Sequence, residues 1–237
     1  MHSKLRFILF IVFIFLYHIP FAQSGNKKID SLVSVAKIAP NDTNKVLLLA
    51  EVSIQYSLSD LSNTRKYAEQ ALQLAQKLKY DYGMLKSYNL IGRSYALQSN
   101  YSLALKNYQS ALSIAQRQGN PSRIAIISMS IGSIYTENKD YAKAFKYLTI
   151  AKDAYDKAGM PYATALYTNW GVYYAKQEKY TEAVGWYTRG IEAEEKKGNP
   201  NAELAILYSN TAGEYIFLNN IPKALYYITR RLRLTRR

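Results

Sequence analysis

The chain has 237 residues, of which 49% are apolar, and a formal net charge of +14. This length suits one or two ordinary domains, or one elongated repeat array. The sequence contains no cysteine, which excludes disulfides, thiolate catalysis and thiolate metal sites. Its two histidines, His2 and His18, both lie within the first twenty residues. If this segment is cleaved, the remaining chain contains no histidine, which is the usual general base and the commonest transition-metal ligand. We expect a protein that is not an enzyme, with no catalytic residues, no metal and no cofactor.

The first 24 residues resemble an export signal. Lys4 and Arg6 give a positive start, residues 7–17 form an unbroken apolar run, and Pro20, a helix breaker, is followed by small residues. The run is well short of the roughly 20 apolar residues that span a bilayer. We therefore expect a signal peptide over residues 1–24 and a periplasmic or secreted protein. The alternative is an uncleaved signal that keeps the chain close to a membrane.

After a lead-in helix, expected over residues 25–41, the sequence repeats itself with a period of about forty residues. Within each repeat, small and aromatic residues recur at helical spacing, and a polar turn separates two such stretches. Each unit is therefore expected to be a hairpin of two helices. The expected units are 42–80, 83–119, 121–159, 161–198 and 200–229.

The recurring small and aromatic residues are expected to pack the helices together. Gly92 facing Ala104, and Gly132 facing Ala144, allow two helix axes to approach closely, while tyrosines fill the wedge between neighbouring hairpins. Gly190 occupies a similar small-residue position, whereas the pattern does not explain Gly185. The expected packing residues are Tyr88, Gly92, Tyr95, Ala104, Tyr108, Ala111, Gly132, Tyr135, Ala144, Ala151, Gly171, Tyr174, Ala183, Tyr187, Ala212, Tyr215 and Ala224.

Polar residues and glycines punctuate the units in a regular way. Asn100 and Asp140 follow the first helix of their units, where they are expected to cap the second helix. Gly119, Gly159 and Gly198 are expected to end the second helices, and a proline follows each of them within two residues.

These positions resemble the tetratricopeptide repeat. Tyr88, Gly92, Tyr95, Ala104 and Tyr108 match its aromatic, glycine, tyrosine and alanine signature. The family's terminal proline is missing, and the period exceeds the usual thirty-four residues, which implies longer helices. The resemblance implies an all-α fold, an α-solenoid of helix hairpins wound as a right-handed superhelix. Residues 42–78 also resemble the opening of exported repeat domains in bacterial sensor proteins, where the array precedes a histidine kinase or a DNA-binding domain.

Other groups of chemically interesting residues have simpler interpretations. Glu192, Glu194 and Glu195 form an acidic cluster, but lysines follow at once, so we expect a solvated helix end rather than a cation site. Trp170 takes the place of isoleucines in other units and is expected in the core, and Trp186 is the other residue able to stack on a ligand. No glycine-rich phosphate-binding loop is present in the sequence.

The first helix of each unit is the expected binding element. In the family these helices line a concave surface that holds extended peptides or partner helices, so the resemblance implies a protein or peptide partner. Amide and cationic side chains there can bond a peptide backbone and a carboxylate, although an ordinary wet helix surface looks the same in sequence. The expected groove residues are Lys86, Asn89, Arg93, Met129, Ser133, Thr168, Asn169, Val172, Lys176 and Asn210.

The basic charge does not indicate nucleic acid, because the lysines are spread along helical faces and an export signal precedes them. Five arginines gather in the last eight residues, and we expect a basic tail over residues 230–237. Arg231 stands where earlier units have a small residue, so the tail is either a basic cap or the stump of a longer array. The leading interpretation is an exported scaffold that binds protein or peptide. The alternative is a stand-alone or truncated extracytoplasmic sensory domain of a signal-transduction protein. The sequence leaves the oligomeric state open.

Overall fold

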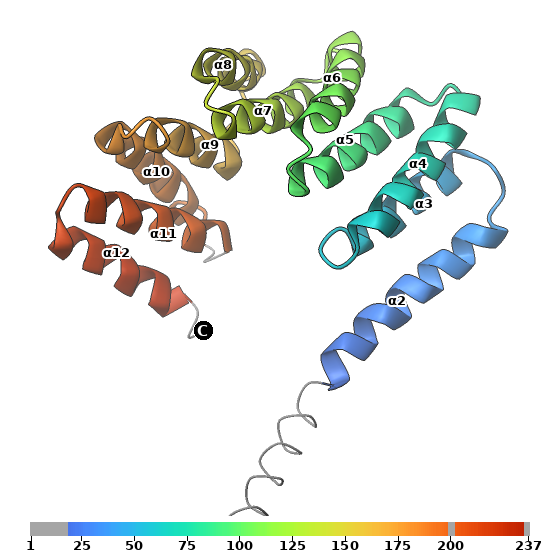
Figure 1. Ribbon diagram of the computed structural model, residues 1–237, viewed down its shortest axis with the longest axis horizontal. Helices are drawn as coiled ribbons and strands as arrows, with labels where there is room; N and C mark the ends of the chain where they lie inside the picture. Colours follow the sequence, from blue (N-terminus) through green and yellow to red (C-terminus); the bar gives the residue numbers. More distant parts are fainter. Residues whose placement is uncertain (1–18, 199–201, 235–237) are drawn as a thin grey trace, which may run out of the picture. The chain divides into compact units, whose positions relative to one another are not determined.

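The structure is a computed structural model that describes residues 19–198 and 202–234, with side chains from Lys27 onward. Over these residues it contains eleven helices and no strand (Figure 1). The helices pair along the chain as in tetratricopeptide repeats, with a repeat length of roughly 40 residues. The all-α solenoid expected from the sequence is confirmed. Residues 1–18 of the expected signal, and the last three residues of the expected tail, lie outside the described residues.

The chain forms two compact units, divided after Ser99. In the first unit, α3 packs against the other three helices. In the second unit, each helix packs against the next along the chain, and α7 and α9 also contact each other. The first unit contains α2 (Ile19–Ile38), α3 (Thr43–Tyr56), α4 (Leu61–Lys77) and α5 (Asp81–Leu97). The second unit contains α6 (Tyr101–Arg117), α7 (Pro121–Glu137), α8 (Tyr141–Lys157), α9 (Thr164–Ala175), α10 (Tyr180–Glu195), α11 (Ala202–Phe217) and α12 (Ile221–Leu234). The expected pairing of Gly92 with Ala104 would join the two units and stays a prediction.

Helix ends lie where the polar residues and glycines predict them. The Asn100 side chain accepts a hydrogen bond from the Leu103 amide at 3.3 Å, and Asp140 accepts one from the Lys143 amide at 3.2 Å. Gly119, Gly159 and Gly198 all adopt the left-handed conformation, with φ between 59° and 70°. The turns inside the hairpins use non-glycine residues in the same conformation, namely Ser99, Lys139, Glu178 and Asn219.

The helix α2 includes Pro20, which the sequence analysis treats as a helix breaker, and continues without interruption to Ile38. The expected signal boundary after residue 24 therefore falls inside a continuous helix. The lead-in helix expected over residues 25–41 begins earlier and ends at Ile38.

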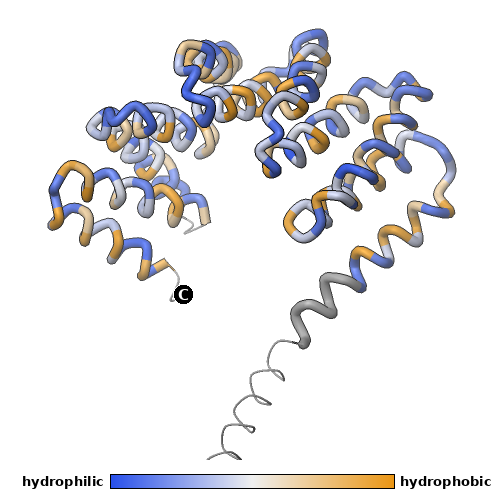
Figure 2. Tube along the Cα trace, viewed as in Figure 1, coloured by the Kyte–Doolittle hydropathy of each residue, from blue (hydrophilic) through white to orange (hydrophobic). Residues whose placement is uncertain are grey.

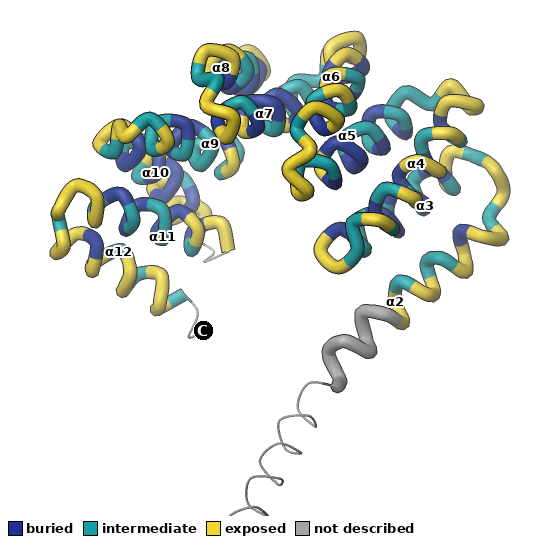
Figure 3. Tube along the Cα trace, viewed as in Figure 1, coloured by how far each residue is buried: buried dark blue, intermediate teal, exposed yellow. Residues whose placement is uncertain are grey.

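Small side chains let the helices cross closely inside each unit. In the first unit Ala68, Ala71 and Ala75 of α4 are fully buried. In the second unit a Cβ atom added to Gly132 would stand 3.0 Å from Leu148 and 3.5 Å from the carbonyl oxygen of Ala144. The predicted crossing of α7 and α8 is therefore confirmed. Buried residues follow one another along most of α7, from Ala125 to Thr136 (Figure 3).

The crossing of α9 and α10 is tighter still. A Cβ atom added to Gly171 would stand 2.1 Å from Cε1 of Tyr187, whose side chain is only 1% exposed. Because the ring is almost completely buried, it can move away only by displacing its neighbours. Gly185, on the same helix as Tyr187, has nothing within 4 Å of an added Cβ atom, so packing does not require a glycine there.

Gly171→Ala is expected to lower the free energy of unfolding by about 1–3 kcal/mol, because the new methyl group overlaps a buried ring. Gly185→Ala makes the same chemical change in open space. It should raise the free energy of unfolding by about 0.5–1 kcal/mol, because alanine has less backbone entropy than glycine in the unfolded chain. Chemical denaturation of both variants measures the difference. Equal effects of the two substitutions would contradict the packing described for α9 and α10.

A carboxylate is buried in the same region. Glu214 of α11 is 8% exposed, and its Oε2 atom has no hydrogen-bond partner among the described residues. Burial raises the pKa of Glu214, since the charged form loses its hydration. Burial, and then the charge of Glu214, raise the pKa of Tyr187. An acid with a raised pKa binds its proton more tightly in the folded state than in the unfolded chain.

The free energy of unfolding is therefore expected to fall as pH rises from the ordinary glutamate pKa through the raised pKa of Glu214. Glu214→Gln should flatten this part of the profile and stabilise the protein at neutral pH, because no charge is then buried. Urea denaturation across this pH range measures both effects. Glu192→Gln, on an exposed residue of α10, is the matched control. A loss of stability at neutral pH in Glu214→Gln would show that the carboxylate is favourably held.

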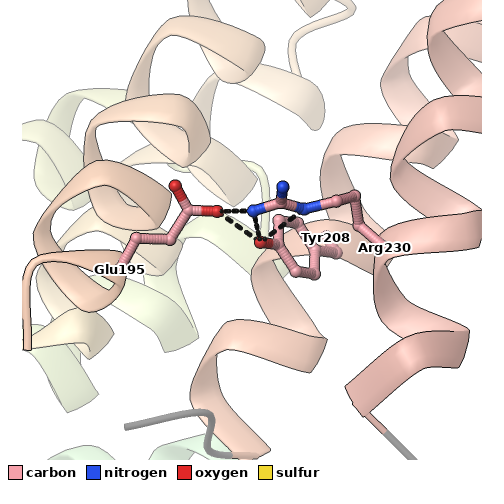
Figure 4. A network of polar contacts seen from close by, with 3 residues as sticks. All are labelled: Glu195, Tyr208 and Arg230. Atoms are coloured by element: carbon pink, nitrogen blue, oxygen red, sulfur yellow. Dashed lines mark hydrogen bonds and ion pairs between the residues drawn. The ribbon is translucent and has the colours of Figure 1, made fainter. Parts of the chain in front are cut away.

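The last helix is attached to its neighbours through Arg230 (Figure 4). Its guanidinium group donates hydrogen bonds of 3.1 and 2.9 Å to the hydroxyl of Tyr208 and forms an ion pair with Glu195, and Tyr208 donates to the same carboxylate. The Arg230 guanidinium also lies over the Tyr208 ring, 5.4 Å from its centroid. The expected boundary between repeat and tail at residue 230 falls inside α12, which continues to Leu234. Its apolar stripe of Leu225, Ile228 and Leu232 is at least 38% exposed.

Candidate functional site

The first helices of the second unit share a stripe of exposed and partly exposed residues, which we name the first-helix face. On α7, α9 and α11 the stripe residues follow the spacing i, i+4, i+7 and i+11, which is one side of a helix. Residues between them are mostly buried, because the other sides pack against the second helices. The first-helix face consists of Ile126, Ser130, Ser133 and Glu137 on α7, Ala165, Asn169, Val172 and Lys176 on α9, and Ile206, Asn210, Gly213 and Phe217 on α11.

An ion pair fixes the register of the first two stripes. Lys176 Nζ lies 2.8 Å from Glu137 Oε2, and these residues occupy the same position in successive repeats. The hydrogen bond to Glu137 raises the pKa of Lys176. Both side chains are at least 40% exposed, so the pair contributes little to stability. Its main effect is to show that the stripes on α7 and α9 run side by side at their carboxyl ends.

At the amino end of the face, the first position of each stripe is apolar. Ile126 is 48% exposed and Ile206 is 51% exposed, with Ala165 between them in the repeat order. Isolated exposed apolar residues are ordinary. Here the exposed isoleucines recur at one repeat position, which makes an apolar margin to the face.

The second position of each stripe carries a group that can form hydrogen bonds. Ser130 donates to the Ile126 carbonyl at 3.2 Å, and Asn169 donates to the Ala165 carbonyl at 2.7 Å. The side chain of Asn210 makes no hydrogen bond to another described residue. An asparagine has two donors and one acceptor oxygen, so Asn169 keeps unused capacity and Asn210 keeps all of it.

The central and last positions complete the face. Ser133 on α7 is exposed, and on α11 an added Cβ atom at Gly213 would meet nothing within 4 Å. No large side chain therefore stands at the central position of either of these two stripes. Phe217 is 67% exposed and stacks on Tyr180 with 4.9 Å between ring centroids. Short side chains in the middle, hydrogen-bonding groups beside them and an apolar margin are the features that an extended peptide requires.

Most groove residues expected in this unit lie on the first-helix face, but they differ in accessibility. Ser133, Asn169, Lys176 and Asn210 are at least partly exposed. Val172 is partly buried against the core cluster that contains Tyr187. Thr168 lies beside the stripe and donates its hydroxyl to the Thr164 carbonyl at 3.1 Å.

The expectation for Met129 is wrong. Its side chain is 4% exposed and packs in a core cluster with Leu148 and Trp170. The reason is that α7 packs against α6, α8 and α9, so its apolar face is wider than a single stripe. Met129 therefore cannot provide an apolar contact to a ligand, and Ile126 takes that role on α7.

The remaining expected groove residues belong to the first unit. Lys86, Asn89 and Arg93 lie on α5, where Arg93 is exposed and the other two are half-buried. They form a stripe of their own on that helix. A groove continuing from α5 to the second unit stays a prediction.

A second surface was not predicted from the sequence. A cleft of about 550 Å³ lies between α8 and α10, and its lining includes Tyr162, Tyr167, Trp186 and Arg189. Arg189 lies 5.2 Å from the Trp186 ring centroid, and that ring stacks on Trp170 at 5.2 Å. Trp170 is 4% exposed, which confirms its predicted place in the core. Two tryptophans on the paired helices of one repeat, Trp170 on α9 and Trp186 on α10, were the available signal for the cleft.

The acidic cluster is only partly a solvated helix end, since Glu192 is exposed but Glu194 is buried. Glu194 is 2% exposed, accepts a hydrogen bond from the Thr164 hydroxyl and pairs with Lys197 at 2.6 Å. Glu195 pairs with Arg230. The carboxylates therefore connect α9, α10 and α12. Among the described residues no group of three or more histidine, cysteine, aspartate or glutamate side chains is placed to hold a metal ion. None of the described helices is long and apolar enough to cross a membrane.

Comparison with known proteins gives one distant relative in sequence. No protein-family model matches the chain. Response regulator aspartate phosphatase I of Bacillus subtilis is 23% identical over 173 residues, which cover 69% of this chain and 44% of that protein. The chain therefore spans less than half the length of this relative.

Several solved structures share the fold. BtubC from P. vanneervenii superimposes with a TM-score of 0.68 and 19% identity, over 90% of this chain and 89% of that one. The TPR-like repeats of a kinesin light chain from Podosopora anserina give 0.62 and 15%, over 82% and 96% of the chains. A Rap protein complexed with competence and sporulation factor gives 0.64 and 19%, over 88% and 69%. At these identities the likeness establishes a TPR-like helical scaffold.

Proposed function

We propose that this chain is a scaffold that binds an extended segment of a protein or peptide on its first-helix face. The observation that carries the proposal is the row formed by Ser130, Asn169 and Asn210, which lies beside the exposed Ile126 and Ile206. The row offers hydrogen bonds to a peptide backbone, while the isoleucines offer contacts to one of its side chains. Specificity for one ligand sequence over another then comes from the last residue of each stripe, which is Glu137, Lys176 or Phe217.

The comparisons support a binding role for this fold. The solved Rap protein is complexed with competence and sporulation factor, so a protein with this fold binds that factor. The relative in sequence is a response regulator aspartate phosphatase, of which this chain spans less than half. We propose that this chain acts by binding and not by catalysis, because it has no cysteine and no histidine after His18.

A sensory role in signal transduction is the second candidate. It is supported by the likeness of residues 42–78 to the opening of sensor repeat domains, and by a relative named for its action on response regulators. We assign both candidates to the same first-helix face. They differ in whether binding is passed on to another domain or protein.

We further propose that the protein is exported. The support is the charged start, the short apolar run and the small residues that follow it in the first 24 residues. A periplasmic or secreted chain meets its peptide ligand outside the cytoplasm.

Asn169→Ala and Asn210→Ala are each expected to weaken peptide binding by about 0.5–1.5 kcal/mol, which is the usual value of one hydrogen bond. Stability should change by less than about 0.5 kcal/mol, since both side chains are partly exposed. The peptide is selected on the parent protein from a displayed library of random unstructured peptides, and its affinity is measured by fluorescence anisotropy.

Asn107→Ala is the matched control for Asn169→Ala. Asn107 lies on the second helix α6 and donates to the Leu103 carbonyl at 2.8 Å, the same bond that Asn169 makes within α9. Its replacement should leave peptide affinity unchanged. If Asn107→Ala weakens binding as much as Asn169→Ala, or if the parent selects no peptide, the assignment to the first-helix face is wrong.

Intact-mass measurement of the chain expressed with its own first residues is expected to show a new amino terminus near Gln23 or Gly25. The mature chain should be found outside the cytoplasm. Replacing Lys4 and Arg6 by glutamate should reduce processing, because the positive start orients the signal. Recovery of the full-length chain in the membrane fraction would instead indicate an uncleaved anchor.

A further inference from the structure

A cleft of about 590 Å³ lies in the first unit between α2 and α4, with α3 beneath it. One wall is an exposed stripe on α4 formed by Lys66, Gln70, Gln73 and Lys77, at the spacing i, i+4, i+7 and i+11. The other side includes Lys37, near the end of α2. The helices that form the cleft belong to one compact unit, so its geometry is internal to that unit (Figure 1).

Four lysines and no carboxylate line this cleft. They are Lys37, Lys45, Lys66 and Lys77. Lys45 donates to the Ala39 carbonyl at 3.0 Å, and Lys66 lies 5.6 Å from the Tyr67 ring centroid, but neither contact supplies a negative charge. The carboxylate of Asp42 instead caps α3 by accepting from the Lys45 amide. The positive charges in the cleft are therefore uncompensated by its own lining.

Five cations in the second unit differ from these lysines. Lys143, Lys152, Lys176, Lys197 and Arg230 each form an ion pair with an aspartate or glutamate, at 2.8 Å or less. The four lysines of the cleft form no ion pair with any other residue that the structure describes. Unpaired charges of one sign gathered in a concave surface attract a ligand of the opposite sign.

The floor of the cleft is apolar. Ala36 and Leu49 are buried beneath it, and Val33 and Leu74 are partly buried at its sides. Figure 2 shows that hydrophilic and hydrophobic residues alternate along α3 and α4. A flat bilayer surface can meet the lysines but cannot reach this floor. A ligand that satisfies both features has acidic groups at its edges and an apolar strip between them.

We propose that this cleft binds an acidic amphipathic helix of a partner protein. The distance along α4 from Lys66 to Lys77 is roughly 16 Å at the usual rise per residue, which equals about three turns of a ligand helix. Such a helix lies in the cleft with its apolar side on Leu49 and Leu74 and with carboxylates facing the lysines. The occupant differs from the extended segment proposed for the first-helix face, and the two sites lie in different units.

The test uses a fluorescein-labelled synthetic helix of about four turns, with leucine on one side and glutamate on both flanks. Anisotropy is measured with the full protein. The probe is expected to bind saturably, and Lys66→Glu with Lys77→Glu should weaken it at least about tenfold, because two attractions become repulsions. The matched control is Lys106→Glu with Lys146→Glu, which changes the net charge equally at exposed lysines of the second unit.

Each result decides the proposal. Loss of binding in the cleft variant, with binding kept in the control and unchanged melting temperatures in both, supports it. Equal weakening in both variants would show attraction to overall charge and overturn it. A probe whose leucines are replaced by serine must bind much more weakly. Equal binding of the two probes would show that the apolar floor of the cleft does not contact the ligand, which contradicts the proposal. Failure of the parent to bind the acidic helix, or binding of phosphatidylserine vesicles through the same lysines without helix binding, also overturns it.

Discussion

The close crossing of helices inside each unit is the constraint on which the remaining structure depends. Two helix axes approach to the usual 8–10 Å only if no long side chain stands between them. Ala68, Ala71 and Ala75 satisfy this condition in the first unit, and Gly132 and Gly171 satisfy it in the second. At Gly171 the requirement is strongest, because the Tyr187 ring fills the space that a Cβ atom would occupy. These contacts fix how each helix is rotated about its own axis.

That rotation determines which side chains face solvent. Once Gly132 faces α8, the residues that reach solvent on α7 are confined to one stripe, and the same holds for α9 around Gly171. Because the crossing positions recur with the repeat, the exposed stripes recur in register as well. The ion pair between Glu137 and Lys176, at equal positions in successive repeats, is direct evidence of that register. The first-helix face is thus a consequence of core packing, and its side chains are free to vary with the ligand.

The sequence predicts the elements of this structure well, because their determinants are local. Helical spacing, the caps at Asn100 and Asp140 and the glycines between units depend on a few neighbouring residues. Several groove residues are also predictable, since the side opposite a buried glycine is known. Met129 is mispredicted because the width of a buried face depends on how many helices surround α7, which is a tertiary property. The contacts at the end of the array are not predictable from the sequence for a similar reason. Arg230 looks like part of a solvated tail until Tyr208 and Glu195 are placed beside it.

The distribution of charge shows most clearly what a sequence alone does not contain. The chain is strongly basic, and in sequence its lysines look alike, each spaced along a helical face. In the second unit the described ion pairs neutralise several of them, and Lys176 is one of these although it was expected to meet a ligand. In the first unit Lys66 and Lys77 lie on one stripe of α4, facing a cleft that no carboxylate lines. Net charge therefore says little about where an acidic partner binds, because only the three-dimensional structure separates cations paired with carboxylates from cations that remain available to a ligand. The two proposed sites follow this division: a neutral, hydrogen-bonding face suits a peptide backbone, and an uncompensated cationic cleft suits an acidic helix.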